Sequence, residues 1–267
     1  GDNLQDDAHR TERNVQFGVR EFAMATVLNG LMLHGGVRVF GGTFFVFSDY
    51  LKGALRLSAL QNLPVTYVFT HDSIAVGEDG PTHEPIEHLA SLRTIPNTYV
   101  FRPADATETQ AAWYLSQKTN DRPTSIVLTR QNLPILENSS FEKVAKGAYV
   151  VYETAADFDT ILIATGSEVA LAIDVARELE KDGSKVRVVS MPSVELFEEQ
   201  SKEYKEELLP LNIRRRVSLE MGNSALWYKY VGLDGLAIGI DKFGASAPAN
   251  KVIEEYGFTV EAVVEKI

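Results

Sequence analysis

The sequence predicts an α/β protein with mostly parallel sheets, divided into two domains. Apolar runs of strand length alternate with segments of helical periodicity from one end of the chain to the other. The chain has 267 residues, 45% of them hydrophobic, which suffices for one large core or two of ordinary size. A polar, weakly patterned segment at residues 136–146 separates two alternating series. We therefore expect one domain at residues 1–140 and a second at residues 141–267.

The first series supplies its elements in regular succession up to residue 128. Helices are expected where apolar residues recur every three or four positions, at residues 24–31, 44–60, 86–93 and 106–118. Strands are expected in the short apolar runs, at residues 15–17, 37–40, 65–69, 99–101 and 125–128. The strand at 65–69 leads into a polar segment, residues 70–85, that is rich in His, Asp, Glu and Gly. Long loops at the carboxyl ends of strands commonly hold ligand sites in such folds.

The second series begins after the polar segment and repeats the same alternation. Its strands are expected at residues 160–165, 186–190, 216–219 and 236–240. Ser167 is predicted to cap a helix, because Val169, Ala172 and Ile173 begin one apolar face directly after it. The turn at Gly166 and Ser167 fits either an anion-binding helix start or an ordinary capped turn. We favour the ordinary turn.

Composition excludes several classes of function. Lys and Arg total 26 against 37 Asp and Glu, and the net charge of -11 repels nucleic-acid phosphates. The basic run at residues 214–216 precedes an apolar stretch and is interpreted as the start of a strand. Cysteine is absent, which excludes disulfides and zinc-thiolate sites and favours a cytoplasmic enzyme. No apolar run is long enough for a membrane span and no signal peptide is visible, so we expect no membrane partner.

A metal-binding helix is the first alternative that the loop suggests. His83 and Glu84 precede His88, in an arrangement similar to the helix of zinc proteases. The histidines are five residues apart instead of four, and Pro85 lies between them, so the imidazoles would point to different faces of a helix. We therefore reject a zinc site, and no metal ligand is predicted in this chain.

The loop and six further runs carry a family resemblance. Residues 70–83 read Thr-His-Asp-Ser-Ile-Ala-Val-Gly-Glu-Asp-Gly-Pro-Thr-His, a long and specific run. The other runs are Gly-Val-Arg-Glu at 18–21, Gly-Thr-Phe at 42–44, Thr-Arg-Gln-Asn-Leu-Pro at 129–134, Ala-Thr-Gly-Ser-Glu-Val at 164–169, Val-Ser-Met-Pro-Ser at 189–193 and Phe-Gly-Ala-Ser-Ala-Pro at 243–248. Together they resemble the transketolase family over almost the whole chain. The resemblance implies two three-layer α/β domains, a pyrimidine-binding domain of a thiamine diphosphate enzyme without its first elements, and the family's carboxyl-terminal domain.

Four residues are implied to contact the thiamine diphosphate cofactor. By its position alone, Glu21 is a carboxylate that favours the positive end of a helix dipole. The resemblance implies instead that it donates to the pyrimidine ring of the cofactor, a role that calls for burial beside aromatic surface. Phe44, Phe47 and Tyr50 lie three apart, so periodicity predicts one apolar helix face. By resemblance they are the walls of the aminopyrimidine pocket.

Four more residues are implied to bind the sugar substrate. By position alone, His71, Asp79 and His83 are surface loop residues, and Arg130 is a cation at the end of a strand. The resemblance implies that His71 and Arg130 hold the sugar phosphate, for which a forked guanidinium is well suited. It implies that Asp79 accepts from a sugar hydroxyl, and that His83 lies near the reacting carbonyl and acts in catalysis.

The implied reaction is transfer of a two-carbon ketol unit from a ketose phosphate to an aldose phosphate, in the pentose phosphate pathway. The diphosphate and its Mg²⁺ or Ca²⁺ need a Gly-Asp-Gly motif that this sequence lacks, so the family's amino-terminal domain is expected to hold them. We expect a homodimer, and we expect the chain alone to be inactive. Dihydroxyacetone synthase, phosphoketolase and deoxyxylulose-phosphate synthase are alternatives within the enzyme class. A catalytically silent, dimerising subunit of a split transketolase is an alternative from another class.

Overall fold

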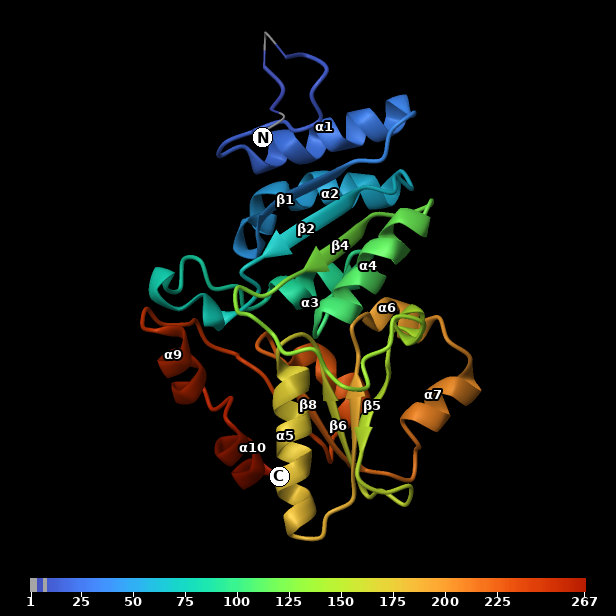
Figure 1. Ribbon diagram of the computed structural model, residues 1–267, viewed down its shortest axis with the longest axis vertical. Coiled ribbons are helices and arrows are strands. Elements are labelled where there is room, and N and C mark those ends of the chain that lie inside the picture. The colour runs from blue at the N-terminus through green and yellow to red at the C-terminus, as the bar shows by residue number, and fades with distance from the viewer. Residues whose placement is uncertain (1–3, 7–8) are drawn as a thin grey trace.

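Two sheets built mostly from parallel strands organise the chain, and the computed structural model describes residues 4–6 and 9–267 (Figure 1). The first sheet has the order β1-β2-β4-β3, and every neighbouring pair is parallel. Its strands are β1 (Phe40–Phe44), β2 (Thr66–Thr70), β3 (Tyr99–Phe101) and β4 (Thr124–Val127). The second sheet has the order β5-β7-β6-β8-β9, in which only the edge strand β5 is antiparallel. Its strands are β5 (Tyr149–Glu153), β6 (Thr160–Ala164), β7 (Val186–Ser190), β8 (Arg215–Leu219) and β9 (Leu236–Ile238). The predicted α/β class is confirmed.

Helices connect the strands and cover the sheets, as parallel connections require. In the first half they are α1 (Glu21–His34), α2 (Ser48–Leu60), α3 (His88–Arg93) and α4 (Ala106–Lys118), with short 3₁₀ helices η1 (Phe45–Phe47) and η2 (Ile74–Asp79). In the second half they are η3 (Lys143–Lys146), α5 (Glu168–Lys181), α6 (Val194–Glu198), α7 (Lys202–Leu208), η4 (Ala225–Trp227), α8 (Tyr228–Val231), α9 (Ala249–Glu255) and α10 (Val260–Lys266). No helix within the described residues is long and apolar enough to cross a membrane.

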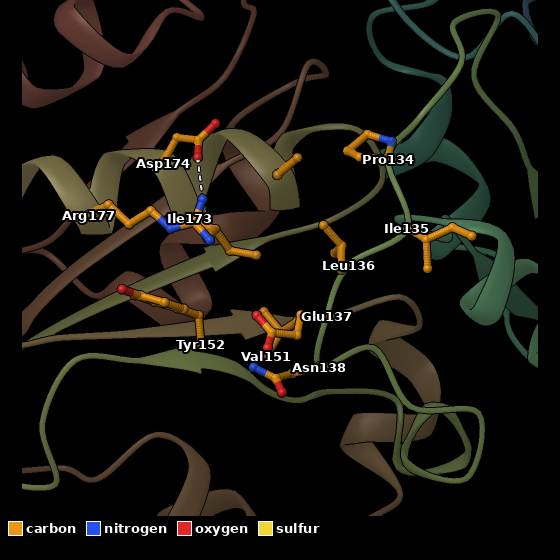
Figure 2. A pocket seen from close by; sticks show the side chains of 11 residues that line it. Pro134, Ile135, Leu136, Glu137, Asn138, Val151, Tyr152, Ile173, Asp174 and Arg177 are labelled. Atoms are coloured by element: carbon orange, nitrogen blue, oxygen red, sulfur yellow. Dashed lines mark hydrogen bonds and ion pairs between the residues drawn. The ribbon is translucent and has the colours of Figure 1, made fainter.

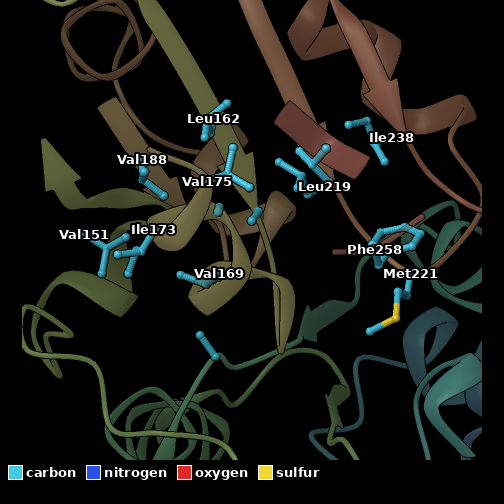
Figure 3. Close-up of a cluster of buried hydrophobic side chains, with 14 of the residues drawn as sticks. Val151, Leu162, Val169, Ile173, Val175, Val188, Leu219, Met221, Ile238 and Phe258 are labelled. Atoms are coloured by element: carbon cyan, nitrogen blue, oxygen red, sulfur yellow. The ribbon is translucent and has the colours of Figure 1, made fainter. Parts of the chain in front are cut away.

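One apolar core continues from the second sheet into the first half of the chain. Leu162 of β6, Val175 of α5 and Leu219 of β8 are fully buried on one face of the second sheet (Figure 3). The same cluster includes Phe101 and Ile126, which lie at the ends of β3 and β4. Full burial of one such side chain stabilises a fold by about 1.5–3 kcal/mol. The two halves of the chain therefore pack against each other through a shared core.

Three predicted elements in the first half differ from the structure. Residues 15–17 form no strand, and the nearest pairing is an isolated bridge between Leu4 and Asn14. The strand predicted at 37–40 was placed too early, since β1 begins at Phe40 and continues to Phe44, and α1 packs closely over Gly41. A Cβ on Gly41 would lie 2.6 Å from Leu28 Cδ1, so this strand lacks the side chains by which a strand is recognised. The helix predicted from residue 44 begins at Ser48, after η1.

The cap predicted at Ser167 is also wrong. Ser167 precedes α5 but has helical dihedrals (φ -59°, ψ -25°) and makes no hydrogen bond to the backbone of the helix. Its hydroxyl donates instead to the side chain of Glu168. The physical reason is that Glu168 is 1% exposed and fully engaged in an ion-pair network, which Ser167 completes.

Candidate functional site

An aromatic cluster forms where the first sheet meets its longest loop. Phe44 ends β1, Phe47 ends η1, and Tyr50 lies in the first turn of α2. The rings of Phe44 and Phe47 are parallel within 3°, with centroids 6.2 Å apart, and Tyr50 follows 6.1 Å from Phe47. The prediction of a single helix face is therefore wrong in its secondary structure, because three successive elements supply these rings. The three rings nevertheless form one continuous surface, and Tyr50 is 66% exposed.

His71 joins this cluster directly after β2. Its backbone adopts the left-handed region (φ 62°), which is uncommon for a residue other than glycine. The imidazole stacks on Phe44 with ring centroids 3.7 Å apart, and Nδ1 shares a hydrogen bond of 2.9 Å with Thr70 Oγ1. Partial burial lowers the pKa of His71, and the charge of Arg130 lowers it further, while Asp79 acts in the opposite direction. The neutral imidazole, which can both donate and accept, is therefore favoured at neutral pH.

The remaining predicted sugar ligands surround His71. Asp79 is exposed at the end of η2, and Arg130 is exposed beyond the end of β4. His83 is half-buried, and its ring meets Phe47 edge-on with centroids 5.5 Å apart. Arg130, Asp79 and His83 all act electrostatically on His71, which means that the fold brings the four groups into one neighbourhood. Because parallel strands end at the same sheet edge, β1, β2 and β4 place these groups together.

Glu21 makes no hydrogen bond or ion pair with the residues of this cluster among the described residues. It begins α1, lies half-buried, and has no hydrogen bond or ion pair among the described residues. We expected burial beside aromatic surface, and this chain alone does not provide it. The reason is that α1 is the outermost layer of the first half (Figure 1), and its neighbour Phe22 is 55% exposed.

A buried ion-pair network, which no pattern in the sequence predicted, links the loop to the second half. Arg102 follows β3 and is 0% exposed. Its Nε donates to Asp72 Oδ2 at 2.9 Å, while its Nη1 donates to the backbone oxygen of Thr165 at 3.0 Å and to the Glu168 carboxylate. Burial alone lowers the pKa of the Arg102 guanidinium, but Glu168 and Asp72 raise it above the ordinary value. The charged pair is therefore maintained in the interior.

A second buried arginine extends this network. Arg93 of α3 donates to both carboxylate oxygens of Glu220 at 2.7 and 2.9 Å, and both side chains are 1% exposed. Trp227 Nε1 donates to the same carboxylate at 3.0 Å. Burial raises the pKa of Glu220, but Arg93 and then Arg102 outweigh burial and lower it to about 2. The only signal in the sequence was the position of Arg102 and Glu220, each directly after a strand.

Within the part of the chain that the structure describes, one group of side chains is close enough together to bind a metal ion. One atom each from Asp49, Glu87 and His88 lie within 4.8 Å of one another. His88 Nε2 bonds to Asp49 Oδ2 at 3.1 Å, and Lys52 donates to Asp49 Oδ1 at 3.0 Å. The ammonium already compensates this carboxylate, so the group is an ion-pair cluster that joins α2 to α3. His83 is not a member of this group.

A cavity of about 370 Å³ lies apart from the aromatic cluster, between the segment after β4 and α5 (Figure 2). Pro134, Leu136 and Ile173 form part of its lining, and Arg177 lies over the ring of Tyr152 at 5.6 Å. None of the predicted site residues lines it. Since ligands in parallel α/β folds bind at the carboxyl ends of strands, we place the candidate site at the aromatic cluster instead.

The fold and the cluster define the class of protein: two-domain α/β proteins whose ligand site lies where parallel strands of one domain end. Residues 2–135 match the family described as transketolase, pyrimidine binding domain, and residues 147–259 match the transketolase-like C-terminal domain. The chain belongs to the transketolase family. The division that we predict at residue 140 falls between the two matched regions and stays a prediction.

Relatives and solved structures agree with this family. A probable transketolase of Streptococcus pneumoniae serotype 4 is 70% identical over all of this chain and 40% of its own length. The transketolase of Bacillus subtilis is 60% identical over 96% of this chain and 39% of its own length. The transketolase structure from Leishmania mexicana superposes with a TM-score of 0.94 and 45% identity over 98% of this chain and 38% of that one. This chain thus spans about 40% of the length of its curated relatives.

One solved structure matches most of its own length. A chain described as a split gene transketolase, inactive beta4 tetramer, superposes with a TM-score of 0.77 over 98% of this chain and 89% of that one. Its identity to this chain is 24%. At that identity the likeness establishes the shared fold alone.

Proposed function

We propose that the whole protein to which this chain belongs is a transketolase, which transfers a two-carbon ketol unit from a ketose phosphate to an aldose phosphate. The observation that supports this most is the meeting of the aromatic wall with His71 and His83, on a loop whose sequence is the family's. The chain contributes the pyrimidine-binding and carboxyl-terminal domains. Thiamine diphosphate supplies the carbon nucleophile that carries the ketol unit when it is bound.

The aromatic cluster fits the flat heterocycle of that cofactor. The parallel rings of Phe44 and Phe47, continued by the exposed ring of Tyr50, offer a surface on which an aminopyrimidine can stack, and a heterocycle bound there would displace water from the rings. His71 already covers one face of Phe44, so the heterocycle would use the remaining surface. Glu21 would donate a proton to the ring nitrogen once a partner covers the outer side of α1. We assign the diphosphate and Mg²⁺ to the amino-terminal domain, because this sequence lacks the Gly-Asp-Gly motif that would hold them. Asp49, next to Tyr50, is already paired with Lys52 and His88.

The polar groups around His71 suit a phosphorylated sugar. Arg130 is exposed and has no ion pair among the described residues, so its guanidinium is available to a phosphate as a fork of donors. His71, favoured in its neutral form, would donate to the same phosphate. Asp79 would accept from a sugar hydroxyl, and His83, held edge-on against Phe47, would orient the reacting carbonyl and hold or release a proton at its hydroxyls.

A homodimer would complete the site. Several apolar side chains of α1 and of the segment just before it are exposed, including Val19 at 93%, Phe22 at 55% and Val27 at 44%. Large exposed apolar side chains gathered in one segment are typical of interfaces, and we propose that a second copy covers this part of the chain and buries Glu21. Sedimentation equilibrium measures the mass of the assembly directly and so tests for a dimer.

The absence of cysteine supports a cytoplasmic location for the assembly.

The experiment uses a protein that includes the amino-terminal domain, incubated with thiamine diphosphate, Mg²⁺, xylulose 5-phosphate and ribose 5-phosphate. We expect a seven-carbon ketose phosphate and a three-carbon aldose phosphate as products, and no turnover by this chain alone. Dihydroxyacetone synthase, phosphoketolase and deoxyxylulose-phosphate synthase would give other products. Absence of any product from the longer protein would favour the silent, dimerising subunit.

A further inference from the structure

The loop that contains the predicted sugar ligands lies against the carboxyl-terminal domain. Ser246 Oγ, in the segment before α9, donates to the backbone oxygen of Glu78 at 2.6 Å. The two backbones approach so closely that a Cβ on Gly77 would lie 2.9 Å from the nitrogen of Ala249. Gly77 also has φ 80°, which other residues adopt only with strain. The loop and the 243–249 segment are therefore fitted to each other at the level of the main chain.

Glu84 closes the carboxyl-terminal end of this loop. It follows His83 directly and is 2% exposed, although it is a carboxylic acid. Its carboxyl group lies against Gly244, where any Cβ would overlap Oε2. Both carboxyl oxygens are buried without a hydrogen-bond partner among the described residues, and the backbone N–H groups of Gly77 in the loop and Ala245 in the carboxyl-terminal domain act on the carboxyl group only electrostatically. A single side chain thus joins both segments at the position next to His83.

Asp72 anchors the amino-terminal end of the loop in the same domain. It follows His71 directly, is 2% exposed, and accepts from Arg102 Nε at 2.9 Å. Arg102 in turn binds Thr165 and Glu168 of the carboxyl-terminal domain. A buried pair of this kind is rigid, because separating one partner leaves an uncompensated charge. His71, whose backbone is in the left-handed region, is therefore adjacent in the chain to a residue that is held in place.

We propose that the carboxyl-terminal domain serves as the positioning support of the sugar-binding loop, with Asp72 as the anchor at one end and the Glu84–Gly244 contact as the latch at the other. This assignment rests on the proposed function for its effect on sugar binding, but not for the latch itself. Ordering a flexible backbone costs conformational entropy, and a ligand that orders a free loop loses affinity for each residue that it orders. A loop ordered beforehand by the second domain spares the sugar this cost.

The decisive variant is Gly244→Ala, whose methyl group expels the Glu84 carboxyl from its place. Gly30→Ala is the matched control, because no atom lies within 4 Å of a Cβ there and φ is not positive. Hydrogen exchange of the chain itself reports the latch without any activity. We expect amides in residues 74–84 to exchange at least about tenfold faster in Gly244→Ala, with β6 unchanged and with no effect of Gly30→Ala. Unchanged exchange in this loop would overturn the proposal.

Three further variants keep the test decisive if Gly244→Ala fails to fold. Ser246 is exposed, so Ser246→Ala removes one hydrogen bond without touching the core, and we expect about threefold faster exchange of the loop. Glu84→Gln preserves the shape of the latch, so the amides of the loop should stay protected from hydrogen exchange. Glu84→Ala removes the latch, so these amides should exchange faster. Equal exchange in Glu84→Ala and Glu84→Gln contradicts a latch.

Kinetics of the longer protein test the consequence for sugar binding. In Gly244→Ala we expect KM for a phosphorylated sugar to rise about fivefold to tenfold, with kcat changed less than about threefold. Faster loop exchange with an unchanged KM would overturn the positioning role. If the parent protein showed no ketol transfer at all, the proposed function would fail, while hydrogen exchange would still decide whether the latch exists.

Discussion

Replacing Glu84 by Gln is expected to change how the stability of this chain depends on pH. Burial raises the pKa of the Glu84 carboxyl from its ordinary 4.5 to about 7, and the N–H groups of Ala245 and Gly77 offset this only in part. Tyr256 is the other titratable group that faces it. Between about pH 4.5 and about pH 7, the folded state holds a proton that the unfolded state releases. Stability therefore falls as the pH rises through this window.

The magnitude follows from the size of the shift. A pKa raised from 4.5 to about 7 corresponds to on the order of 3 kcal/mol. Because Glu84 lies beneath an exposed loop, solvent screening reduces this value, and we expect a loss of about 2 kcal/mol in the free energy of unfolding across the window. Glu84→Gln has no proton to release and should lack this component.

Urea unfolding at several pH values from about 4.5 to about 8, followed by tryptophan fluorescence, measures the effect. The parent should lose stability as pH rises, and Glu84→Gln should give a flatter curve. The unfolding free energy of Glu84→Gln will still depend on pH to some extent, because burial also raises the pKa of Glu108 to about 7. Glu78→Gln is the control, since its side chain is exposed in the same loop. A Glu84→Gln variant with the same pH dependence as the parent would refute the reasoning.

Three other predictions concern the proposed site and its support. In a protein that includes the amino-terminal domain, Glu21→Gln should lower kcat by orders of magnitude with little change in sugar affinity, and activity within about tenfold of the parent would contradict its role. Arg130→Ala should weaken the binding of phosphorylated sugars by about 1.5–3 kcal/mol, as measured by KM, and should hardly affect the binding of unphosphorylated ones. An equal loss of binding for both kinds of sugar would contradict phosphate binding by Arg130. Arg102→Leu should destabilise the chain by about 3–5 kcal/mol in urea unfolding, because Asp72 and Glu168 would remain buried without a cation; a loss below about 1 kcal/mol would exclude the anchor.

Calorimetry of this chain with thiamine diphosphate and Mg²⁺ is the fourth test. The cluster offers mainly ring stacking, which contributes about 1 kcal/mol per aromatic pair beyond buried area, so we expect weak binding. Micromolar binding that depends on Mg²⁺ would show that this chain holds more of the cofactor site than we propose.

Much of the fold was predictable because its signals are local. The alternation of strand and helix periodicity predicted the α/β class and the positions of β2, β3 and α4. β1 was placed too early, because Gly41 and Gly42 lack the side chains that mark a strand; the close packing of α1 leaves no room for a side chain at Gly41. The loop at residues 70–83 was recognisable from its sequence, and the roles of its residues remain predictions.

The sequence alone determined the family, the α/β class and the identity of the loop, since each depends on residues that are neighbours along the chain. Only the tertiary structure decided which distant groups meet. Arg102 binds Asp72 and Glu168 although 30 and 66 residues separate them, and Glu84 reaches Gly244 in the other domain. Such pairs depend on how two sheets pack, because the attraction between buried charges acts through space and no sequence spacing encodes it.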